Sequence, residues 1–105
     1  MRVIVYGVGA IGGTLAARLT LTGTEVVGIA RGSMLEAIRR QGGLNFLSHS
    51  GRGVVGFPVV AGPQEIGWRP DDCILLTMKS NDTQAALEAL AAAGVGRQAV
   101  VCAQN

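Results

Sequence analysis

The apolar positions of the chain alternate between short aliphatic runs and longer stretches with helical spacing. The aliphatic runs, which are typical of buried strands, cover residues 2–6, 25–30, 71–78 and 98–104. The stretches with helical spacing and composition cover residues 10–22, 33–41 and 82–94. The pattern therefore predicts strands and helices that follow one another in turn.

Two features of the helical stretches predict local detail. Ile11, Leu15 and Leu19 recur at a spacing of four and predict one apolar face of the first helix. Ser33 stands three residues before Glu36, a capping-box pattern that predicts Ser33 as the N-cap of the second helix.

The middle of the chain has a different pattern. Residues 44–48 and 54–61 have strand character, and the polar, glycine-rich segment 49–53 between them predicts a hairpin. Pro58 cannot donate a backbone hydrogen bond, so the second of these strands is expected at a sheet edge. The whole order predicts an α/β fold: a Rossmann-type, doubly wound parallel sheet with helices on both faces and an inserted β-hairpin.

Composition agrees with this fold and narrows the function. The chain has 105 residues, enough for one domain, and 49% of them are apolar while 15% are charged. The net charge of +2 is small and the arginines are scattered, which argues against a nucleic-acid or membrane-surface partner. No apolar run reaches the roughly 18 residues of a membrane span. We expect a domain over residues 1–105 without nucleic-acid or membrane partners.

The cysteines and the histidine suggest no metal site. Cys73 and Cys102 fall inside predicted strands, lack ligand spacing to His49, and are expected to be buried free thiols. Unpaired thiols favour a reducing, cytoplasmic location. His49 lies in the predicted hairpin turn, where a solvated histidine is favoured over a catalytic one. The chain stops directly after a strand-like run, so we expect a fragment of a longer protein.

The richest chemical signal is the segment Gly-Val-Gly-Ala-Ile-Gly, which follows the first predicted strand and opens the first helix. Gly7 permits a tight turn, Gly9 lets a pyrophosphate approach the backbone, and Gly12 allows close helix packing. The helix N-terminus would then face the phosphates. The alternative is a plain strand-to-helix turn that needs glycine for packing only. The candidate pyrophosphate-binding residues are Gly7, Val8, Gly9, Ala10, Ile11 and Gly12.

The end of the second strand predicts which dinucleotide binds. NAD-binding domains usually carry Asp or Glu there for the ribose hydroxyls, but this chain has Arg31 and no carboxylate. A guanidinium pairs with a 2′-phosphate through charge-assisted hydrogen bonds, so NADP(H) is favoured as cofactor. Arg31 as a solvated surface residue is the alternative.

Two polar residues follow later strands, at the sheet edge where open α/β sheets bind ligands. Lys79 comes after the run ending at residue 78, and Asn105 after the last strand. By position alone Lys79 fits a solvated loop equally well, and Asn105 says little.

Taken together, the segments GVGAIGG, ARG, LLTMKSNDT and CAQN resemble the N-terminal domain of the ketopantoate reductase (2-dehydropantoate 2-reductase) family. The resemblance covers essentially the whole chain. It implies NADPH-dependent reduction of a 2-keto acid, ketopantoate to pantoate, a step towards pantothenate and coenzyme A.

The resemblance also implies roles for single residues. Gly7 to Gly12 would hold the pyrophosphate and Arg31 the 2′-phosphate. Lys79 would contact the cofactor near its nicotinamide, and Asn105 would bind both cofactor and substrate. The family's proton-donating lysine lies in a C-terminal helical domain that this chain lacks, so no catalytic residue is expected here. A homodimer would form through that domain.

Two other functions stay open. One is the cofactor domain of another hydroxy-acid dehydrogenase, although such proteins are expected to have a helix where this chain predicts a hairpin. The other is a non-catalytic, nucleotide-sensing regulatory domain, which usually carries Asp at the end of the second strand.

Overall fold

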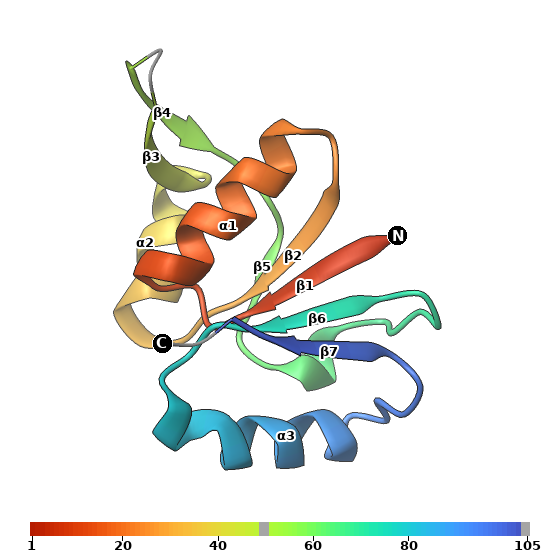
Figure 1. Ribbon diagram of the computed structural model, residues 1–105. Helices are drawn as coiled ribbons and strands as arrows, with labels where there is room; N and C mark the ends of the chain where they lie inside the picture. Colours follow the sequence, from red (N-terminus) through yellow and green to blue (C-terminus); the bar gives the residue numbers. More distant parts are fainter. Residues whose placement is uncertain (49–50, 104–105) are drawn as a thin grey trace.

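The computed structural model of the chain describes residues 1–48 and 51–103 (Figure 1). Its centre is a five-stranded sheet in the order β5-β2-β1-β6-β7, and every pair of neighbouring strands in it is parallel. The strands are β1 (Arg2–Tyr6), β2 (Glu25–Ile29), β5 (Val59–Val60), β6 (Cys73–Leu76) and β7 (Ala99–Cys102). The predicted parallel sheet is confirmed.

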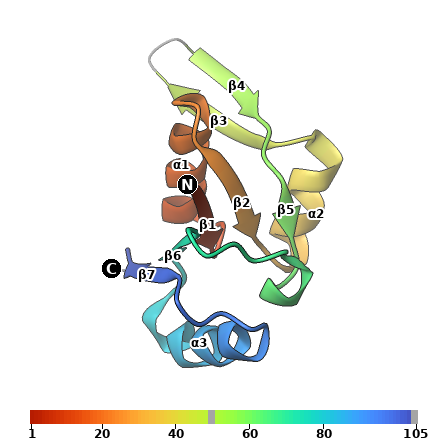
Figure 2. The same ribbon diagram turned by 90° about the vertical axis from the view of Figure 1, so that its right-hand side faces the viewer.

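Helices cover both faces of this sheet, also as predicted. They are α1 (Ala10–Leu21), α2 (Gly32–Gln41) and α3 (Thr83–Ala92). Figures 1 and 2 show α1 and α2 on one face and α3 on the other. Single 3-10 turns occur at Pro63–Glu65 and Ser80–Asp82.

Two apolar layers hold the helices to the sheet. Alternate residues of one strand point to opposite faces, so Ile4 packs towards α3 while Val3 and Val5 pack towards α1. On the α3 side, Ile74 and Leu76 are fully buried beside Ala86. Because β1 and β6 face apolar layers on both sides, they consist of the continuous aliphatic runs that the sequence displays.

The predicted apolar face of α1 is not its most buried face, although Leu19 packs against the core. Its buried residues are Gly12, Gly13, Ala16 and Ala17, whereas Ile11 is 38% exposed and Leu15 and Leu19 are only half-buried. The side chains of the buried face are small because α1 lies close against the sheet, and larger ones would push it away.

The predicted start of α2 is also wrong. Arg31, with an extended backbone (φ −142°, ψ 164°), is the N-cap, and no side chain hydrogen bond caps the helix. Ser33 lies inside the helix, so the capping box with Glu36 does not form.

The inserted hairpin is confirmed, with two corrections. Strands β3 (Leu44–Ser48) and β4 (Gly51–Val55) pair antiparallel in a separate two-stranded sheet, so residues 51–53, expected in the turn, belong to β4. The run 54–61 is not one strand, because β4 ends at Val55 and Val59–Val60 joins β2 as the edge strand of the main sheet. Pro58 therefore precedes the edge strand that it was expected to enter, and its carbonyl accepts a hydrogen bond from the Gly28 N–H at 2.8 Å.

The structure also shows where the two cysteines lie and bears on metal binding and membrane spans. Cys73 is half-buried and Cys102 is exposed on the edge strand β7, so the prediction of two buried thiols is wrong. Across residues 1–48 and 51–103, no group of His, Cys, Asp and Glu is arranged to hold a metal ion. Within the same ranges, every helix is too short or too polar to span a bilayer. His49 lies outside the described residues.

Candidate functional site

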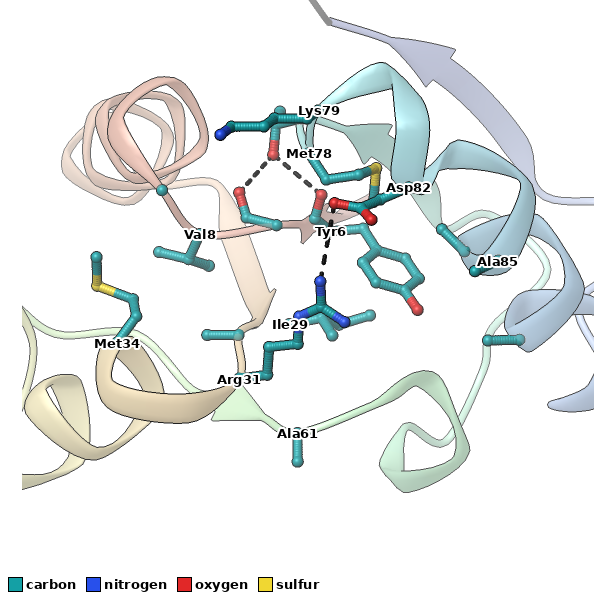
Figure 3. A pocket seen from close by; sticks show the side chains of 16 residues that line it. Tyr6, Val8, Ile29, Arg31, Met34, Ala61, Met78, Lys79, Asp82 and Ala85 are labelled. Atoms are coloured by element: carbon teal, nitrogen blue, oxygen red, sulfur yellow. Dashed lines mark hydrogen bonds and ion pairs between the residues drawn. The ribbon is translucent and has the colours of Figure 1, made fainter.

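A cavity of about 490 Å³ opens at the carboxyl ends of β1, β2 and β6. Its walls come from the turn after β1, the start of α2, the segment after β6, and α3 (Figure 3). Of the sequence-predicted residues, the cavity brings together Gly7, Val8, Gly9, Arg31 and Lys79. Ala10, Ile11 and Gly12 do not line it.

Gly7 sets the turn that leaves β1. Its φ of +106° favours glycine, and an added Cβ would lie 2.9 Å from the backbone nitrogen of Met78. The N–H groups of Gly7 and Val8 both donate to the Ile29 carbonyl, at 3.0 and 3.3 Å. The turn is therefore fixed against the ends of both β2 and β6.

Gly12 and Gly9 have different roles in the same motif. An added Cβ at Gly12 would collide with the Gly7 carbonyl oxygen and lie 2.5 Å from Thr77 Oγ1, so this glycine brings α1 onto the sheet. At Gly9 an added Cβ would meet nothing within 4 Å. Gly13, which the sequence analysis did not single out, would place a Cβ 2.9 Å from Leu44 Cδ2.

Thr77 is a site residue that sequence reasoning missed. Its hydroxyl donates a hydrogen bond shared between the carbonyl oxygens of Gly7, at 2.7 Å, and Tyr6, at 3.0 Å (Figure 3). Its N–H donates to the Tyr6 carbonyl, also at 3.0 Å. A polar β-branched residue at the end of an aliphatic strand was the signal that could have found it.

Among the described residues, the start of α1 has neither a capping side chain nor an acidic residue in its first turn. Its N-cap is Gly9, a residue without a side chain. The partial positive charge of the helix N-terminus is therefore not neutralised by a neighbouring carboxylate within that turn.

Arg31 stands at the mouth of the cavity, two residues after the end of β2. Its side chain is 85% exposed and forms an ion pair of 3.8 Å with Asp82, whose side chain is 44% exposed. Tyr6 contributes a half-buried ring to the wall nearby. Burial raises the pKa of Tyr6, and the positive charge of Arg31 partly offsets that rise.

Lys79 is exposed and lines the opposite part of the mouth. Figure 3 shows Lys79 on the α1 side of the cavity and Asp82 with Ala85 on the α3 side. Asn105 lies outside the described residues, so its role stays a prediction. The pairing of β7 with β6 continues to Ala103, whose N–H donates to the Leu76 carbonyl at 2.9 Å.

The parallel sheet, the helices on both faces and the glycine turn at its carboxyl edge define a Rossmann-type domain. Comparison with known proteins then gives the family. The sequence model of the family described as "Ketopantoate reductase PanE/ApbA" matches residues 3–105. The chain belongs to this family, and the resemblance inferred from the sequence is confirmed.

Individual relatives agree with this assignment. The chain is 33% identical over 106 residues to a 2-dehydropantoate 2-reductase of Mesorhizobium japonicum, covering 100% of this chain and 32% of the relative. The crystal structure of a PanE/ApbA family ketopantoate reductase from Ralstonia eutropha JMP134 superimposes with a TM-score of 0.84 at 31% identity, covering 100% of this chain and 34% of that one.

A third relative extends the comparison. The 2-dehydropantoate 2-reductase of Porphyromonas gingivalis W83 gives a TM-score of 0.80 at 29% identity, covering 95% of this chain and 37% of that one. By their names these relatives are oxidoreductases, and the chain spans about a third of their length.

Proposed function

We propose that this chain is the NADP(H)-binding domain of a reductase that acts on a small 2-keto acid, with ketopantoate as the leading substrate. The observation that carries the proposal is Arg31, an 85% exposed cation at the mouth of the cavity, where the end of β2 offers no carboxylate. A guanidinium there favours a ribose with a 2′-phosphate over one with a free hydroxyl.

The residues around the cavity fit the rest of such a cofactor. Above Gly9 there is open space, and the start of α1 offers N–H donors without a competing carboxylate in its first turn, which suits a pyrophosphate. Ile29, Ala61 and Ala85 supply apolar wall for a base. When bound, the cofactor supplies a hydride.

Lys79 and Asn105 are proposed to serve the reacting end. Lys79 is an exposed cation on the α1 side of the cavity, on the other side from Asp82. A lysine and an amide at this edge would orient an anionic keto acid beside the nicotinamide. Asn105 is proposed to contact both cofactor and substrate.

Reduction of a ketone also needs a proton for the developing alkoxide. We assign no proton donor to this chain, and we propose that the donor belongs to the part of the family's longer proteins that this chain does not span. A homodimer through that part, a cytoplasmic location and a role in pantothenate synthesis belong to the same proposal.

The test is a titration of the chain with NADPH and with NADH, followed by nicotinamide fluorescence. We expect tighter binding of NADPH, and we expect Arg31→Ala to lose that preference. Hydrogen bonds to a charged group contribute about 1.5–3 kcal/mol, so NADPH affinity should fall by about 10- to 150-fold while NADH affinity stays nearly constant.

Arg40→Ala is the matched control, because Arg40 is an exposed arginine in the last turn of α2, at the other end of the helix that begins after Arg31. It should leave both affinities unchanged. Equal binding of the two cofactors, or no binding of either, would refute the 2′-phosphate assignment.

A further inference from the structure

Asp82 faces Arg31 across the cavity mouth. The Oδ2 atom of Asp82 lies 3.8 Å from the Nη2 atom of Arg31, and both residues line the cavity (Figure 3). Arg31 is the N-cap of α2, and Asp82 is the N-cap of α3 on the opposite face of the sheet. The ion pair therefore joins two helices across the opening that a ligand must enter.

The Asp82 carboxylate does not cap α3, although Asp82 is the N-cap residue of this helix. An N-cap aspartate normally accepts a hydrogen bond from a backbone N–H of the first helical turn. In α3 no side chain hydrogen bond from this residue caps the helix. The backbone of Asp82 is instead fixed by its N–H, which donates to the Lys79 carbonyl at 2.9 Å. The carboxylate is thus left to face Arg31.

A carboxylate and a phosphate compete for the same donors of one guanidinium. The Arg31–Asp82 pair is well exposed, at 85% and 44%, so solvent screens it and holds it weakly. An arriving phosphate can therefore displace the carboxylate, and the displacement reduces the net gain in affinity.

We propose that Asp82 is a specificity-determining residue: its carboxylate occupies Arg31 in the ligand-free domain and lowers the affinity for ligands that carry a 2′-phosphate. This inference rests on the proposed function of Arg31. It follows that the domain prefers NADP(H) over NAD(H) by a smaller factor with Asp82 present than it would with Arg31 alone.

The experiment measures calorimetric binding of adenosine 2′,5′-bisphosphate and adenosine 5′-monophosphate to the 105-residue chain. Asp82→Asn removes the charge and keeps a side chain that suits a helix start. An exposed ion pair contributes about 0.2–1 kcal/mol, so Asp82→Asn should bind the bisphosphate about 1.4- to fivefold more tightly. Affinity for the monophosphate should not change.

Two further variants separate competition for Arg31 from a general effect of charge. Glu88→Gln removes the same charge from an exposed position of α3 outside the cavity, and it should leave both affinities unchanged. In an Arg31→Ala background, Asp82→Asn should have no effect on bisphosphate binding, because no guanidinium remains to be released.

Several results would overturn the inference: weaker or unchanged bisphosphate binding by Asp82→Asn, an equal gain in Glu88→Gln, or an undiminished gain without Arg31. If the wild-type chain binds the bisphosphate but Asp82→Asn binds it no better, only this inference fails. If the wild-type chain does not prefer the bisphosphate over the monophosphate, the proposed role of Arg31 fails as well.

Discussion

Replacing Asp72 by alanine is expected to destabilise the whole domain, because this residue holds the amino ends of β1 and β6 together. Its carboxylate accepts hydrogen bonds from Arg2 Nε at 2.9 Å and from Arg2 Nη2 at 2.6 Å. The two side chains are 8% and 0% exposed. Asp72 also accepts from the Arg69 N–H at 2.9 Å, and Arg2 Nη2 donates to the Gly67 carbonyl at 2.9 Å.

The burial of this pair sets the magnitude. Asp72→Ala leaves the Arg2 guanidinium buried with the Gly67 carbonyl as its remaining acceptor, and breaking a buried pair in this way costs about 3–5 kcal/mol. A domain of this size unfolds with a free energy of about 5–15 kcal/mol, so the loss is a large part of the total. Replacing both residues by apolar ones, Arg2→Met with Asp72→Leu, should recover most of it.

The same pair predicts a dependence on pH. Burial alone would raise the pKa of Asp72, but hydrogen bonds from Arg2 and from the Arg69 N–H outweigh it and lower the pKa below its usual value. A lowered folded-state pKa stabilises the domain above the unfolded-state pKa of about 3.9, and this contribution is lost as pH falls through the folded-state pKa. The stability gap between wild type and Asp72→Ala should therefore be constant near neutrality and should narrow in acid.

Urea unfolding followed by circular dichroism, at neutral and acidic pH, measures both effects. The matched control is Glu25→Gln, since the Arg69–Glu25 pair has a similar distance of 2.9 Å but side chains that are 50% and 55% exposed. Exposed pairs contribute at most about 1 kcal/mol. The reasoning is refuted if Asp72→Ala costs no more than Glu25→Gln, or if the gap to wild type does not narrow in acid.

Four further variants test the glycine turn and α1, each by urea unfolding. Gly12→Ala should lower the unfolding free energy by about 1–3 kcal/mol through overpacking, whereas Gly9→Ala, with open space, should cost less; equal losses would contradict the packing role of Gly12. Thr77→Val should cost about 1 kcal/mol, because the hydroxyl no longer bonds the Gly7 carbonyl, and no loss would mean that this bond is unimportant. Ile11→Gln should change the unfolding free energy by less than about 0.5 kcal/mol, since Ile11 is 38% exposed. A larger loss would show that Ile11 contributes to the core.

The alternation of strands and helices was predictable because a parallel sheet buried on both faces requires continuous aliphatic strands. Strand 2–6 was predicted with the same bounds as β1. The face of α1 was not predictable from large side chains, because the helix buries its small ones, Gly12, Gly13, Ala16 and Ala17. Spacing identifies an apolar face, but it does not measure how closely that face approaches the sheet.

The candidate site was predictable to the extent that its residues follow strand ends. Gly7, Gly9, Arg31 and Lys79 do, and they meet at one cavity. Thr77 was missed because its role depends on the carbonyls of residues 6 and 7, which are 71 and 70 positions away. Such contacts become visible only when β1 and β6 are placed in register.

Hydrogen bonds at both ends of the β1–β6 pair fix the glycine turn more firmly than they fix Arg31. At the amino ends the buried Arg2–Asp72 pair joins the strands, and at the carboxyl ends Thr77 bonds the carbonyl of Gly7. The glycine turn is therefore held on both strands before any ligand arrives. Arg31 differs, because its side chain is 85% exposed and its ion pair with Asp82 is weak. Substitutions around Arg31 should accordingly change ligand preference. Substitutions around Gly7 should alter the stability of the fold and the ligand affinity together.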